Sequence, residues 1–247
     1  MDEVLIHVAP VLIGDGIRLF SQNGMAPVRL EKTEVLEPGA DHQHALPLHG
    51  IGPRIHKGIH AEAGSMRKLI IWDMVTVDGF FEGPDRDISW FVFEEELENY
   101  IRETQEKADT LIFGRVTYEL MAAYWPSEQG WIADFMNKIE KVVFSRTLKS
   151  ADWNNTTLFN GNVAEEVSKL KTRDGGDIFV FGSADLTATL LKHGLIDEYH
   201  LGINPVILGR GTPLFKGGPN RISLKHLETR TLKSGVVILH YAPESRQ

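Results

Sequence analysis

The sequence predicts a three-layer α/β fold with a mostly parallel central sheet and a C-terminal antiparallel hairpin. Two observations carry this prediction: apolar strand segments alternate with helical segments along most of the chain, and two further strands follow one another at its end. The turn residues Lys233, Ser234 and Gly235 separate that last pair, which favours a hairpin. Open α/β sheets bind ligands at the carboxyl ends of their strands, so we expect the site there.

The elements follow one another in a regular order. Residues 69–77 are apolar and β-branched, which predicts a buried strand, and residues 91–105 have the apolar spacing of a helix. Asn162 suits a helix N-cap and Gly194 suits a helix stop. The other predicted strands are 110–113, 141–144, 177–181, 198–203, 223–232 and 236–241, and the other helices 117–123, 131–139, 163–170 and 186–192.

Composition excludes several classes of protein. Of the 247 residues, 42% are hydrophobic and 24% charged, as in ordinary globular proteins, and the formal net charge of −8 disfavours a nonspecific nucleic-acid binder. The absence of cysteine removes thiolate nucleophiles, cysteine-bound zinc and disulfides. The start is acidic, and no apolar run approaches the roughly 20 residues that span a bilayer. We therefore expect a cytoplasmic protein without nucleic-acid or membrane partners.

An internal repeat defines the domain organisation. Residues 1–20 match residues 196–215 without a gap, and several of the non-identical pairs exchange one aliphatic residue for another. Residues 1–38 therefore read as a partial copy of the tail of a domain, placed before a complete domain at 66–243. The identical pairs are Asp2/Asp197, Glu3/Glu198, Pro10/Pro205, Val11/Val206, Gly14/Gly209, Gly16/Gly211, Leu19/Leu214 and Phe20/Phe215.

Between the repeat and the domain, residues 39–65 are rich in His, Gly and Pro and lack periodicity, which predicts a flexible linker. A metal site is the alternative, because imidazole is a common zinc ligand. No carboxylate-supported cluster accompanies these histidines, so we expect a tether, no metal, and no catalytic role for residues 1–65. A duplication remnant and an artefact of gene-start assignment both stay open. The histidines are His42, His44, His49, His56 and His60.

The first informative junction follows the predicted strand 110–113. Gly114 permits close approach of a ligand to the backbone, and the helix N-terminus behind it offers free N–H groups for a phosphate. Arg115 adds a cation and Thr117 a hydroxyl. A well-capped strand-to-helix connection is the alternative interpretation.

Two more junctions repeat this chemistry. Ser145 and Arg146 follow strand 141–144 and suit a ribose 2′-phosphate, although a solvated surface pair is the alternative. Gly182 and Ser183 follow strand 177–181, where glycine lets a flat ring or a pyrophosphate approach the main chain, or simply makes a tight turn.

Together these motifs resemble the dihydrofolate reductase-like superfamily, and more closely bacterial proteins similar to the C-terminal reductase domain of the bifunctional riboflavin-biosynthesis enzyme. The segments that carry the resemblance run from VTVDGFFEGP through IFGRVTYELMAAYWP and VFSRTL to FVFGSADLTATLLKHGLIDEYHLGINPVILGRGTPLF. The resemblance implies the dihydrofolate reductase-like fold, NADPH as hydride donor, a small-molecule substrate and a homodimer. The closest named activity is 5-amino-6-(5-phosphoribosylamino)uracil reductase.

The resemblance also implies roles for the junction residues. It assigns Gly114, Arg115 and Thr117 to the cofactor phosphates, Ser145 and Arg146 to the adenosine 2′-phosphate, and Gly182 and Ser183 to the nicotinamide side and pyrophosphate.

On the substrate side, Asp78 follows the first strand where the family has an aspartate-glycine pair, and we expect it to contact substrate or relay a proton. A turn-forming Asp-Gly is the alternative. Glu95 is a weaker candidate for a substrate carboxylate, because it lies in an acidic run typical of a solvated helix face.

Two departures leave the substrate open. The GRVTYE segment resembles dihydrofolate reductase rather than the riboflavin-pathway reductases, and the proline-framed pterin pattern of dihydrofolate reductase is missing. A noncatalytic NADP(H)-binding or regulatory protein is the alternative function. A third hypothesis treats the N-terminal repeat as a strand that extends another subunit's sheet edge.

Overall fold

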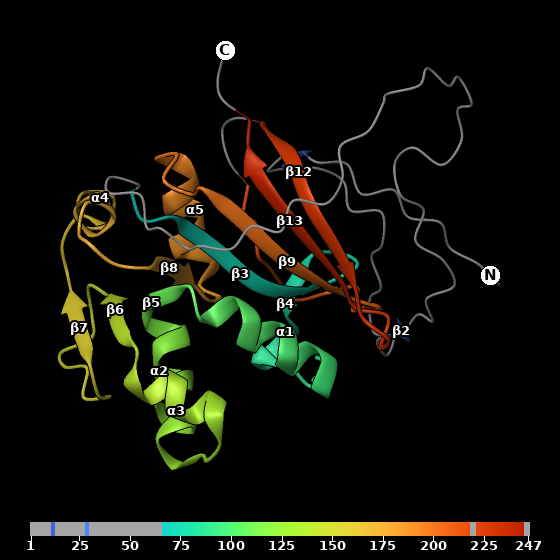
Figure 1. Cartoon of the computed structure of the whole chain (residues 1–247), viewed down its shortest axis with the longest axis horizontal. Helices are drawn as coiled ribbons and strands as arrows, with labels where there is room; N and C mark the ends of the chain where they lie inside the picture. The colour runs from blue at the N-terminus through green and yellow to red at the C-terminus, as the bar shows by residue number, and fades with distance from the viewer. Residues whose placement is uncertain (1–10, 13–27, 30–65, 218–220, 245–247) are drawn as a thin grey trace, which may run out of the picture.

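The computed structural model describes residues 11–12, 28–29, 66–217 and 221–244 (Figure 1). The predicted linker 39–65 and its histidines lie outside the described residues. Of the predicted repeat, two short strands are described, β1 (Val11–Leu12) and β2 (Val28–Arg29). The domain predicted at 66–243 contains all the other helices and strands that the structure describes.

A nine-stranded mixed sheet forms the middle layer, in the order β1-β12-β13-β9-β3-β8-β5-β6-β7. The six strands from β9 to β7 run parallel, while β13 and β12 continue the sheet in antiparallel pairing. The predicted fold class is therefore confirmed. These strands are β3 (Leu69–Thr76), β5 (Ala108–Gly114), β6 (Glu140–Phe144), β7 (Thr156–Phe159), β8 (Asp177–Val180), β9 (Glu198–Asn204), β12 (Ile222–Thr231) and β13 (Val237–Pro243).

Helices cover both faces of the sheet, with α1, α2 and α3 on one face and α4 and α5 on the other (Figure 1). Successive residues of β3 serve both layers, because side chains alternate across a strand. Ile70 packs in the core with Tyr118 of α2 and Met136 of α3, whereas Leu69 and Ile71 pack in the core of α4 and α5. The helices are α1 (Glu95–Gln105), α2 (Arg115–Tyr124), α3 (Trp131–Lys138), α4 (Val163–Lys171) and α5 (Ala184–Lys192).

The local signals at helix ends are confirmed in two cases and wrong in one. The Asn162 side chain accepts hydrogen bonds from the first N–H groups of α4, and Gly194 ends α5 with φ of +62°. The predicted helix start at Phe91 is wrong, because α1 begins at Glu95. Phe91 packs instead against a small core that contains Trp90 and Val206, so its apolar character serves a loop.

Several short elements escaped the sequence analysis, β7 among them. β4 (Phe80–Glu82) pairs with β11 (Thr212–Pro213), which fastens the loop after β3 to the C-terminal part of the chain. Gly211 makes this contact possible, since a Cβ there would lie 2.3 Å from the Glu82 carbonyl oxygen. Strands of two or three residues are too short to show an alternating apolar pattern in the sequence. Their formation depends on tertiary contacts. The other unpredicted elements are β10 (Val206–Ile207) and the 3₁₀ turns η1 (Pro84–Arg86) and η2 (Trp125–Ser127).

Candidate functional site

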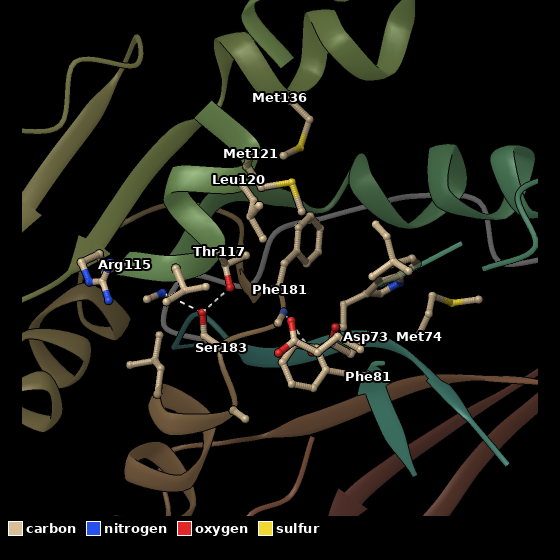
Figure 2. Close-up of a pocket in the computed structure, with 18 of the residues that line it drawn as sticks. Asp73, Met74, Phe81, Arg115, Thr117, Leu120, Met121, Met136, Phe181 and Ser183 are labelled. Atoms are coloured by element: carbon tan, nitrogen blue, oxygen red, sulfur yellow. Dashed lines mark hydrogen bonds between the residues drawn. The ribbon is translucent and has the colours of Figure 1, made fainter. Parts of the chain in front are cut away.

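A cleft of about 1790 Å³ lies at the carboxyl ends of β3, β5, β6 and β8. Its walls come from loops that the parallel strands bring together although they are far apart in the sequence, and Figure 2 shows its centre. All seven residues predicted for cofactor binding line this one cleft: Gly114, Arg115, Thr117, Ser145, Arg146, Gly182 and Ser183.

Hydrogen bonds join the loops after β5 and β8. The Gly114 N–H donates to Ser183 Oγ at 2.8 Å, and the hydroxyls of Thr117 and Ser183 share a hydrogen bond of 2.8 Å (Figure 2). Ser183 Oγ accepts from the Gly114 amide, and either hydroxyl can donate in its pair with Thr117. When Ser183 is the donor, the Thr117 hydroxyl hydrogen is available to a ligand. Two of the predicted junctions thus form a single unit.

A side chain would be crowded at either glycine of this junction. A Cβ on Gly114 would lie 3.0 Å from Ser183 Oγ, and a Cβ on Gly182 would lie 3.1 Å from Thr117 Oγ1. Gly182 has φ of +58°, and Ser183 is also left-handed, with φ of +61°. A left-handed serine is strained, and such strain is concentrated at functional sites.

The variant Gly182→Ala is expected to lower the free energy of unfolding by about 1–3 kcal/mol, because alanine is strained at positive φ and its Cβ crowds Thr117. Equilibrium urea denaturation measures this change. Gly161→Ala is the matched control, since a Cβ there meets no heavy atom within 4 Å. Equal stability of the two variants would contradict the assignment of strain to Gly182.

Two helix N-termini open into the cleft without side-chain caps. α2 begins after Gly114 and α5 begins after Ser183, and neither residue's side chain accepts from the first-turn N–H groups. Uncapped N–H groups and the helix dipole together attract anions. Arg115 and Arg146 add exposed guanidinium groups beside them, the first of which pairs with Glu119 at 2.8 Å. This end of the cleft therefore suits phosphate groups.

Ser145 positions this basic edge. Its Oγ accepts hydrogen bonds from the N–H groups of Thr147 and Leu148, at 3.1 and 2.9 Å. These contacts fix the turn that follows β6 and present Arg146 to the cleft. The hydroxyl hydrogen of Ser145 remains able to donate to an anion.

A carboxyl group that the sequence analysis missed lies in the cleft. Asp73 stands in the middle of β3, and its Oδ2 accepts a hydrogen bond of 2.9 Å from the Gly182 N–H. Burial raises the pKa of Asp73 well above its usual range, and the Gly182 hydrogen bond opposes this effect only in part. A lone aspartate within the apolar run LIIWDMVTV was the available signal.

Asp78, predicted to contact substrate, has a different environment. Its carboxylate accepts hydrogen bonds from the Thr76 hydroxyl and from the N–H groups of Leu208 and Gly209, at 2.6, 3.3 and 2.7 Å. It is absent from the cleft lining among the described residues, and it ties the turn after β3 to the segment after β10. The geometry therefore favours the turn-forming interpretation of Asp78.

Glu95 likewise lies away from the cleft, exposed at the first position of α1. One turn later on the same helix, Glu98 lines the cleft and accepts a hydrogen bond from the indole N–H of Trp131. Glu98 follows the acidic run Glu94–Glu96, and none of the three residues of that run is among the described residues that line the cleft.

The rest of the cleft beside Asp73 is apolar. Phe81 and Phe181 flank the carboxyl group, and Leu120 and Met121 of α2 face it from across the cleft (Figure 2). Trp72 packs on Phe181 with a ring-centroid separation of 5.5 Å. Flat aromatic walls around a single polar group are typical of sites for planar rings.

Solved structures of other proteins share this fold. A Shewanella sp. PV-4 protein named for riboflavin biosynthesis has a TM-score of 0.62 at 18% identity, over 72% of this chain and 99% of that one. The deaminase/5-amino-6-(5-phosphoribosylamino)uracil reductase of Thermotoga maritima has a TM-score of 0.53 at 15% identity, over 72% and 57%. The chain therefore has the dihydrofolate reductase-like fold that these structures share.

Sequence comparison then gives the family. The RibD C-terminal domain model matches residues 67–238, so the chain belongs to the RibD C-terminal domain family. The uncharacterized Bacillus subtilis (strain 168) protein YyaP is 37% identical over 180 residues, which cover 71% of this chain and 94% of YyaP. The uncharacterized protein YwjB of the same strain is 30% identical over 176 residues, 71% of this chain and 97% of YwjB.

Two features are absent from the part of the chain that the structure describes. Residues 66–217 and 221–244 contain no helix that is both long and apolar enough to cross a bilayer. The same part of the chain contains no group of three or more histidine, aspartate or glutamate side chains arranged to hold a metal ion.

Proposed function

We propose that this protein is an NADPH-dependent reductase of a small heterocyclic substrate, with 5-amino-6-(5-phosphoribosylamino)uracil reductase as the closest named activity. Membership of the RibD C-terminal domain family supports an oxidoreductase. The observation that carries the proposal is the link between the two halves of the cleft. The Gly182 N–H binds the Asp73 carboxyl group, and the next residue, Ser183, joins the phosphate-binding loops.

The residues of the cleft fit NADPH. The uncapped N-termini of α2 and α5 would hold its pyrophosphate, with Thr117 donating a hydrogen bond. Arg146, Ser145 and Arg115 would hold the adenosine 2′-phosphate, the group that distinguishes NADPH from NADH. The glycines at 114 and 182 would let the cofactor lie against the main chain.

When bound, NADPH supplies a hydride to the substrate ring. The chain's own task is to position that ring, exclude water and provide the proton. Phe81 and Phe181 provide flat apolar walls, and Asp73 provides the proton. Because burial raises its pKa, Asp73 holds a proton more readily than an exposed aspartate, and since Oδ2 accepts from Gly182, we assign that proton to Oδ1. Oδ1 then donates to a ring nitrogen or carbonyl oxygen of the substrate.

A noncatalytic NADP(H)-binding or regulatory protein is the competing function, and it needs no catalytic acid. Asp73 favours the reductase, since a desolvated carboxyl group in a cleft is a characteristic feature of an acid catalyst. Turnover separates the two functions. Loss of NADPH absorbance with a pyrimidine, pteridine or quinone substrate supports the reductase, and saturable binding without turnover of any of them supports the alternative.

The binding test is a fluorescence titration of the protein with NADPH and, separately, with NADH. The indoles of Trp72, Trp125 and Trp131 line the cleft and report on occupancy. NADPH is expected to bind at least about tenfold more tightly, because one charge-assisted hydrogen bond to the 2′-phosphate contributes about 1.5–3 kcal/mol. Absence of binding, or equal affinity for the two nucleotides, would contradict the proposed cofactor.

A further inference from the structure

Two short antiparallel pairings join the N-terminal repeat to the C-terminal part of the chain. β1 pairs with the beginning of β12, so that Val11 lies opposite Ser223 and Leu12 opposite Ile222. β2 pairs with β10, so that Arg29 lies opposite Val206 and Val28 opposite Ile207. Each pairing therefore combines one strand of the repeat with one strand of the tail that it copies.

The two strand pairings correspond to each other when the N-terminal repeat is aligned with the tail that it copies. The ungapped match aligns Val11-Leu12 of β1 with Val206-Ile207 of β10. With a gap of one residue introduced before residue 28, Val28-Arg29-Leu30 aligns with Ile222-Ser223-Leu224, so that β2 corresponds to the beginning of β12. The contact of Val11 with Ser223 and that of Val206 with Arg29 are thus the same contact, made twice with the copies exchanged.

A tail that closed on itself would pair its own β10 with its own β12, but here each strand pairs with the other copy. The segment between them is held elsewhere, because β11 pairs with β4 and the Asp78 carboxylate binds the N–H groups of Leu208 and Gly209. Each copy therefore gives one strand and receives one. A self-complementary contact of this kind is what a two-fold axis between identical subunits generates.

We propose that the N-terminal repeat occupies, within one chain, the interface that would otherwise bind the tail of a second copy. The surface consists of β10 and the beginning of β12, and its natural alternative occupant is the same pair of strands from another chain. In the full chain the repeat fills this surface, so the protein does not dimerise through it. When the repeat is displaced, two chains exchange tails and form a homodimer.

Two physical arguments support this occupant. Val206 and Ile207 are only 4% exposed, and the backbone groups through which β10 and the beginning of β12 pair with the repeat would lose these partners without it. The linker joins the repeat to its site covalently, which gives an effective concentration on the order of millimolar. A second chain at micromolar concentration cannot compete. The homodimer predicted from the family resemblance is therefore expected only after the repeat is displaced, and this inference does not depend on the proposed function.

The test uses the full-length protein with Val11→Pro and Val28→Pro together. Proline lacks the N–H that a strand pairing needs, and both changes lie outside residues 66–243. The matched control is Val11→Ile with Val28→Ile, which keeps both strands. Molar mass is measured by light scattering during gel filtration, and hydrogen exchange reports the protection of the amides at 206–207 and 222–223.

We expect the wild type and the isoleucine control to have the mass of one chain and the proline variant the mass of two. The amides at 206–207 and 222–223 should stay protected in that dimer, because a second tail replaces the repeat. An excess of a peptide of residues 1–38 from the wild type should return the variant to the mass of one chain plus peptide. A proline variant with the mass of one chain would overturn the proposal, as would a wild type that already has the mass of two.

Discussion

Replacing Asp73 by asparagine is expected to lower kcat by about two to four orders of magnitude, the usual contribution of a general acid. Asparagine keeps the size of the side chain, and its amide oxygen can still accept from the Gly182 N–H. It cannot release a proton to the substrate. Steady-state kinetics with the best substrate found for the wild type measures the loss, while the affinity for NADPH should be nearly unchanged.

The pH dependence gives the same variant a second readout. Burial raises the pKa of Asp73, so the folded protein binds its proton more tightly than the unfolded chain does. The wild type therefore loses stability as pH rises from the ordinary aspartate pKa towards the raised one. The asparagine variant should be more stable than the wild type by a margin that grows across this window and then becomes constant. Thermal unfolding at a series of pH values measures it.

Asp78→Asn is the control for position. Asp78 lies five residues away and binds backbone N–H groups outside the cleft, so its replacement should reduce stability and have a smaller effect on kcat. If the Asp73 variant retained wild-type kcat, or if the Asp78 variant lost activity to the same extent while remaining folded, the assignment of the acid to Asp73 would be wrong.

Replacing Arg146 by alanine is expected to raise the Kd for NADPH by about tenfold to a hundredfold and to leave that for NADH almost unchanged. The reason is specific to one phosphate: Arg146 is an exposed guanidinium at the cleft edge, next to Ser145, and NADH lacks the 2′-phosphate. Fluorescence titration with both nucleotides measures the change in selectivity. Arg173→Ala is a matched control, since it removes an exposed arginine that pairs with Glu140 and does not line the cleft.

If the Arg146 variant bound NADPH and NADH more weakly by the same factor, the Arg146 side chain would instead be assigned to the pyrophosphate, which the two cofactors share. An unchanged affinity for NADPH would remove Arg146 from the cofactor site altogether.

The side of the cleft for which we propose cofactor binding could be located from sequence, because its residues lie at strand ends. Gly114, Arg146 and Ser183 each follow a predicted parallel strand, and parallel strands bring their carboxyl ends to one edge of a sheet. To locate these residues it was enough to know where the strands end along the chain and that they are parallel, and no knowledge of side-chain packing was needed. The β12–β13 hairpin was predictable for a similar reason, since Gly235 supplies the turn with φ of +86°.

The substrate side could not be predicted in the same way. Asp73 lies inside a strand whose apolar pattern made it look like core, and only the loop after β8 makes it a cleft residue. Asp78 has the stronger local signal, an aspartate before a glycine, but its carboxylate is used by backbone groups about 130 residues further along the chain. Contacts over that separation leave no trace in local sequence.

The peptide unit of Gly182 lies between the Asp73 carboxyl group and the loop for which we propose phosphate binding, and this arrangement would link two equilibria. In the proposed complex, the negative charge of a cofactor beside Ser183 would raise the pKa of the nearby Asp73 further, because a neighbouring negative charge disfavours a second one. By thermodynamic reciprocity, protonation of Asp73 would then strengthen cofactor binding by the same factor. The proposed site would therefore couple binding of the reductant to protonation of the acid.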